Sequence, residues 1–164
     1  KYITMMENER IISLFQNLYD GEPWIDVTIK STLAKLTAEQ AAARVLDNCN
    51  TIWEIVNHLI AWRIAVKERI RGNNIKTPGN NYIQKVVDTS KTAWAETLKK
   101  LDNSQRDWVQ FLGNINETDL QKSYEPGQMT NYELIQGIIQ HDAYHLGQII
   151  IIAKQGKENR NTVQ

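Results

Sequence analysis

The stretch QHDAYHLGQI, residues 140–149, is the part of the chain that best indicates its fold. It has strong helical character, and it places His141 and His145 four residues apart. Residues four apart project from the same face of a helix, one turn above the other. The stretch therefore predicts a helix that carries two imidazole rings on one face.

The chain contains only one further histidine, His58, which lies in a second long helical segment. Two rings on one helix and a third from a neighbouring helix can converge on a single cation, and three histidines with an open fourth position are typical of catalytic zinc sites. A lone histidine on an apolar face is more often a hydrogen-bonded core residue. Two unpartnered rings facing one interior are costly to bury, however, and a shared cation removes that cost. We therefore predict that His58, His141 and His145 bind one divalent metal ion.

Amphipathic patterns of helical period extend over most of the chain, and no convincing alternation typical of strands separates them. We expect four long helices over residues 5–19, 52–71, 89–112 and 130–156, and a short helix over 38–47 between the first two. Gly156 is expected to end the last of these helices. Capping boxes are expected at the start of several helices: Thr4 with Glu7, Thr37 with Gln40, Thr51 with Glu54, and Thr130 with Glu133. The pattern predicts an all-α four-helix bundle that forms one domain over residues 1–164.

The composition is that of a globular protein and argues against some classes of partner. Hydrophobic residues make up 41% of the chain, and 19 basic residues balance 19 acidic ones. This neutral balance argues against nucleic acid or an anionic membrane as a partner. No apolar run is long enough to span a membrane. The single cysteine, Cys49, cannot form an internal disulfide, so we expect a reducing, cytoplasmic setting.

Two carboxylates lie close in sequence to the histidines. Glu54 comes one turn before His58 and is either a general base or, as we favour, the capping partner of Thr51. Asp142 lies about 100° round the helix from His141, which turns it away from the ion. It either binds the backbone or a histidine Nδ1 behind the metal site, or lies on the solvated surface.

Other residues near the histidines have several possible roles. Trp62, one turn after His58, is expected to wall a pocket, while the five tryptophans in general are expected to lie mostly in the core. Tyr144 and Gln148 flank His145 at helical spacing, so that either orients a ligand or simply packs. Gly147 costs the helix about 1 kcal/mol relative to alanine, which suggests that another helix approaches closely there.

These residues resemble the DinB/YfiT-like superfamily. The resemblance rests on H-x-x-Y-H-x-G-Q-I over residues 141–149 and on NHL at 57–59. GEPW at 21–24 and LTAEQA at 36–41 also look like the family. The resemblance covers nearly the whole chain, and the first of these motifs is fairly specific.

The resemblance implies a four-helix bundle in up-down-down-up order, with His58, His141 and His145 as ligands of a divalent ion. Zinc and nickel are the typical ions of the family, and its members are often homodimers. Characterised relatives include transferases that use a low-molecular-weight thiol. The thiol is expected here on the resemblance alone.

Three functions of the protein therefore remain open, and each involves a small-molecule substrate or ligand. The first is a metal-dependent thiol S-transferase, in which the open coordination position holds a thiolate. The second is a metal-dependent hydrolase, which needs a general base, and only Glu54 or Asp142 is near enough in sequence to be one. The third is a non-catalytic binding or sensor protein with a structural ion or none. Because neither carboxylate is well aimed, we favour the transferase.

Overall fold

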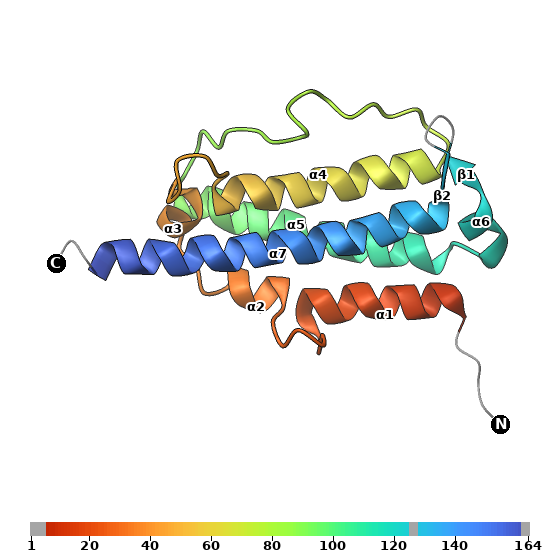
Figure 1. Ribbon diagram of the computed structural model, residues 1–164, viewed down its shortest axis with the longest axis horizontal. Coiled ribbons are helices and arrows are strands. Elements are labelled where there is room, and N and C mark those ends of the chain that lie inside the picture. The colour runs from red at the N-terminus through yellow and green to blue at the C-terminus, as the bar shows by residue number, and fades with distance from the viewer. Residues whose placement is uncertain (1–5, 125–127, 162–164) are drawn as a thin grey trace.

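Four long helices form a bundle in the computed structural model, which describes residues 6–124 and 128–161. They are α1 (Glu7–Asp20), α4 (Ile52–Ile70), α5 (Lys91–Gly113) and α7 (Asn131–Asn161). Helix α4 packs against both α5 and α7, and α1 packs against α5. Figure 1 shows α1 and α7 running in one direction along the long axis, with α4 and α5 running in the other. The expected all-α fold and its up-down-down-up order are confirmed.

The starts of the helices follow from local capping. The Thr51 hydroxyl accepts a hydrogen bond from the Glu54 amide, and the Glu54 carboxylate accepts one from the Thr51 amide, as predicted. Helix α1 begins later than predicted. Its N-cap is Met6, whose amide donates a hydrogen bond to the Glu9 carboxylate at 2.9 Å. The cap predicted at Thr4 lies outside the described residues.

Several short elements were missed by the sequence analysis. Helices α2 (Ile29–Leu33) and α6 (Glu117–Gln121), like α3 (Ala38–Ala42), have five residues each. Strands β1 (Ser123–Tyr124) and β2 (Met129–Thr130) form a two-residue antiparallel pair. Elements this short show no periodicity, so only their caps could reveal them. Helix α3 is shorter than the predicted range 38–47, since the backbone becomes extended at residue 43.

Helix α7 runs straight through Gly156, where we expected it to end, and continues to Asn161. A Cβ atom on this glycine would lie 3.3 Å from a methyl carbon of Val45. Gly156 therefore allows the segment after α3 to pack closely against α7, and it is not a helix cap.

The core consists of two buried clusters of apolar side chains along the bundle. Trp53, Trp94 and Trp108 are buried within them, as expected for most of the tryptophans. Trp24 is 97% exposed, and Leu14, expected on the apolar stripe of the first helix, is also exposed. No helix in the described parts of the chain is both long and apolar enough to cross a membrane.

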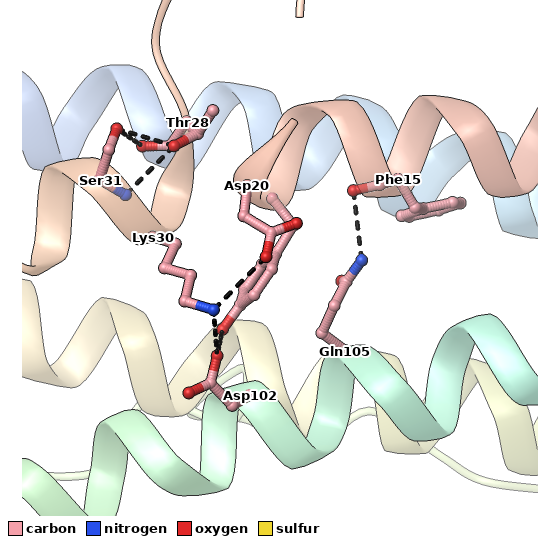
Figure 2. A network of polar contacts seen from close by, with 8 residues as sticks. Phe15, Asp20, Thr28, Lys30, Ser31, Asp102 and Gln105 are labelled. Atoms are coloured by element: carbon pink, nitrogen blue, oxygen red, sulfur yellow. Dashed lines mark hydrogen bonds and ion pairs between the residues drawn. The ribbon is translucent and has the colours of Figure 1, made fainter. Parts of the chain in front are cut away.

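Polar contacts join α1 and α2 to α5 (Figure 2). The Tyr19 hydroxyl donates to Asp102 at 2.5 Å, and Lys30 lies 3.7 Å from the same carboxylate. Burial, more than the Asp102 hydrogen bond, raises the pKa of Tyr19 above its usual value. Gln105, a polar residue on the buried face of α5, donates to the Phe15 carbonyl at 3.2 Å. This side chain therefore cross-links two helices.

The connection between α4 and α5 spans the length of the bundle, because these two helices run parallel (Figure 1). Asn81 and Tyr82, within it, both adopt positive φ angles, 51° and 60°. The Tyr82 ring packs edge-on against Trp62 of α4, with centroids 5.4 Å apart. The connection thereby covers the part of α4 that carries His58.

Candidate metal centre

The three histidine rings converge between α4 and α7. Nε2 of His141 lies 2.9 Å from Nε2 of His58, and one nitrogen from each of the three rings falls within a group no more than 4.8 Å across. The ring centroids are 4.4 to 4.9 Å apart. The spacing of four residues places His141 and His145 on one face of α7, and the packing of α4 on α7 brings in His58. The structure thus brings together all three predicted ligands.

Burial keeps the rings of His58 and His145 in the neutral form that binds metal ions. His58 is 2% exposed and His145 is 9% exposed, whereas the side chain of His141 is 22% exposed. Burial, aided by the neighbouring rings His141 and His145, lowers the pKa of His58 to about 4. Burial also lowers the pKa of His145, with a smaller effect of His141 in the same direction. At neutral pH both rings are uncharged and can offer a lone pair.

Gln148 fixes the orientation of His145. Nδ1 of His145 donates to the Gln148 side-chain oxygen at 2.7 Å, and the Gln148 amide in turn donates to the Tyr144 hydroxyl at 2.9 Å. A histidine whose Nδ1 carries the proton presents the lone pair of Nε2 to a cation. Of the two roles left open for Gln148, it therefore takes the orienting one. Tyr144 is 64% exposed, and its ring packs edge-on against the ring of His145, with centroids 5.1 Å apart. It also contacts His145 indirectly, through its hydrogen bond with Gln148.

Asp142 is fully buried and paired with Arg63 of α4, so of the two positions left open for it, the solvated surface is excluded. Oδ2 of Asp142 accepts from Arg63 Nη2 at 2.6 Å and from Nε at 3.1 Å. Oδ1 has no hydrogen-bond partner and lies 3.7 Å from Nδ1 of His141, which also has none. Asp142 therefore lies behind His141, and its charge is neutralised by Arg63. Sequence reasoning missed Arg63, although a carboxylate on a buried helix face needs a cationic partner.

Glu54 takes the structural role that we favoured. Both of its oxygens lie 2.9 Å from Arg44 Nη2, and one also accepts from the Thr51 amide at 2.8 Å. The carboxylate is buried in these contacts. Arg44 was missed because it follows α3 in an irregular segment with no pattern to place it.

Trp62 and Tyr82 form a wall beside the histidines. The Trp62 ring lies 5.8 Å from His141 and 6.4 Å from His58, between centroids, as expected of a pocket wall. Tyr82, in the long connection, was not predicted. The close approach of a helix expected at Gly147 is wrong, since nothing lies within 4 Å of where its Cβ would be.

A divalent cation fits the chemistry of this cluster. Three imidazole nitrogens converge, two of the rings have a pKa lowered by burial, and the ring of His145 is oriented with Nε2 free. The Nε2 atoms of His58 and His141 lie within hydrogen-bond distance of each other, at 2.9 Å, and Nδ1 of each ring is buried without a hydrogen-bond partner. Neutral imidazole suits zinc and nickel among the divalent ions. The cluster can therefore hold a metal ion, and three protein ligands leave a position for a further one.

A family model described as the DinB superfamily matches residues 28–149, a range that contains all three histidines. No curated protein and no solved structure matches the chain.

Proposed function

This chain belongs to the DinB superfamily, and from that premise we propose that it is a metal-dependent S-transferase. In this proposal His58, His141 and His145 hold one divalent cation, zinc or nickel. The convergence of the three imidazole nitrogens within 4.8 Å is the observation that carries it. The substrates would be a low-molecular-weight thiol and a small electrophile.

The bound cation would act as a Lewis acid that holds the thiol as its thiolate at neutral pH. The thiol proton goes to solvent, the sulfur lone pair forms the new S–C bond, and the leaving group departs with its bonding pair. The protein's residues position the reaction. Gln148 holds His145 in the required tautomer, and Trp62 and Tyr82 keep water from one side of the cluster. His141, the most exposed of the three rings, marks the side from which substrates approach.

The two carboxylates near the histidines favour transfer over hydrolysis. A hydrolase needs a base that takes a proton from bound water. Glu54 is occupied by Arg44 and by the cap of α4, and Asp142 is neutralised by Arg63. Neither carboxylate is free to act as that base, whereas a thiol needs no base once it is bound as a thiolate.

We also propose that the protein is a cytoplasmic homodimer. The dimer is supported by the family resemblance, and the cytoplasmic setting by the single cysteine, Cys49, which cannot form an internal disulfide.

The test begins with elemental analysis of protein purified without an affinity tag or a chelator. We expect one zinc or nickel ion per chain, a strong loss of it in His145→Ala, and its retention in Gln136→Ala, the matched control at an exposed position on the same helix. Cobalt-substituted protein mixed with small thiols should then show a sulfur-to-metal charge-transfer band. A cobalt protein that gives no such band but cleaves esters or amides would be a hydrolase. If it gives neither signal, the protein is a binding module and the proposal is wrong.

A further inference from the structure

A groove beside the histidine cluster has an almost entirely apolar lining. It lies between α4, α7 and β2 and has a volume of about 280 Å³. Its walls include Trp62 and Val66 from α4 and Leu134, Gly137 and Ile138 from α7. Most of these side chains are large and apolar, and His141 also lines the groove.

His141 connects the groove to the candidate metal centre. It is the most exposed of the three rings, and it forms part of the groove wall. Trp62 also belongs to both places, since its ring centroid lies 5.8 Å from that of His141 and it lines the groove. A molecule in the groove would therefore lie against the side from which the cluster can be reached.

The one cationic side chain in the lining, Arg69, is held by other contacts. Its Nε donates to the Ile75 carbonyl at 3.1 Å, its Nη2 donates to the Thr77 hydroxyl at 2.8 Å, and its guanidinium lies 5.2 Å from the centroid of the Trp62 ring. These contacts leave almost no polar surface in the groove. The lining therefore suits an uncharged apolar group better than an anion.

We infer that this groove binds the apolar part of the electrophilic substrate. A cavity of about 150 Å³ holds a benzene ring, so the groove has room for a ring with a short chain. The role as a substrate site rests on the proposed function, but binding of an apolar group in the groove does not. The substrate class is thus an electrophile that carries an aromatic or branched aliphatic group next to its reactive carbon.

Gly137 offers a direct test, because nothing lies within 4 Å of where its Cβ would be. Because Gly137 lines the groove, a leucine there would occupy part of its volume. It also removes a helical glycine, so Gly137→Leu should melt no lower than the natural protein. Gln136→Leu is the matched control, since it adds the same side chain at the exposed neighbouring position on α7, outside the groove lining.

The probe is 4-phenyl-1-butanol, titrated into metal-free protein and followed by amide and indole NMR shifts. We expect the shifts to centre on Gly137, Met129 and the Trp62 indole. Each methylene that loses its burial weakens binding about fourfold, so Gly137→Leu should weaken binding of the probe at least about tenfold. Gln136→Leu should leave it within about twofold, and 1,4-butanediol, which lacks the ring, should cause no such shifts.

Shifts centred elsewhere, or unchanged binding in Gly137→Leu, would overturn the inference. Shifts at Gly137 and Met129 that depend on protein concentration without any probe would also overturn it, because a second copy of the chain would then fill the groove. Since the protein in this titration is metal-free, the outcome is independent of whether thiol transfer is found. If the groove binds the probe but no thiol transfer is detected, only the proposed function fails.

Discussion

Replacing Asp142 by asparagine should destabilise the protein strongly, although the change is nearly isosteric. The carboxylate is completely buried, and Arg63, with which it forms a hydrogen-bonded ion pair, is 2% exposed. Asp142→Asn leaves an oxygen to accept the two hydrogen bonds but removes the charge that compensates the guanidinium. Breaking a buried pair in this way typically costs about 3–5 kcal/mol. Because the hydrogen bonds can persist, we expect the lower end, about 3 kcal/mol.

The cost is best measured by urea unfolding of the metal-free protein, so that loss of metal does not contribute. With a slope near 2 kcal/mol/M, a loss of about 3 kcal/mol moves the midpoint by about 1.5 M. The melting temperature should fall by about 6–12 °C for a chain of this size. Glu68→Gln is the matched control, because its pair with Arg71 is equally short, 2.7 Å, but exposed. That variant should lose less than about 1 kcal/mol.

The double variant Arg63→Met with Asp142→Leu separates the pair from its surroundings. A buried ion pair replaced by apolar residues of similar volume is often no less stable. The double variant should therefore be more stable than Asp142→Asn. Two results would contradict this account of the pair as mutual neutralisation of two buried charges. One is a loss of less than about 1 kcal/mol of unfolding free energy in Asp142→Asn. The other is a double variant that loses as much unfolding free energy as Arg63→Met and Asp142→Leu together.

Three further outcomes follow from the site and the proposed assembly. Gln148→Leu should weaken metal affinity about 10–100-fold by releasing Nδ1 of His145, as measured by competition with a chelator; unchanged affinity would show that Gln148 does not set the tautomer. The unfolded chain takes up a proton at His58 near pH 6.5, whereas the folded chain resists it until about pH 4. The unfolding free energy of metal-free protein should therefore fall as the pH drops from about 6.5 to about 4, and it should fall less steeply in His58→Leu. If denaturant unfolding gives a flat or rising stability over this pH range, the low pKa of His58 is contradicted. Sedimentation should give a dimer at tens of micromolar, and a monomer would remove that proposal.

Much of the site could be predicted from sequence because it depends on contacts within single helices. The capping box of Thr51 with Glu54 spans three residues, and the shared face of His141 and His145 spans four. Hydrogen bonds and side-chain neighbours at these separations are set by helix geometry alone. Four amphipathic helices likewise indicate a bundle whatever their order, because each must bury one face.

The tertiary structure decided what lies between helices. Asp142 lies on the helix of His141, yet its role depends on Arg63, 79 residues away in the chain. Periodicity shows that a face is buried but not which helix covers it. The sequence therefore left Asp142 either on the solvated surface or behind the metal site, and it did not reveal Arg63 as its partner. Only the packed bundle likewise shows that Gly156 makes room for Val45 and does not end α7. The pairing of helix faces, which brings His58 to the other two histidines and opens the apolar groove beside them, is fixed only when the whole bundle packs.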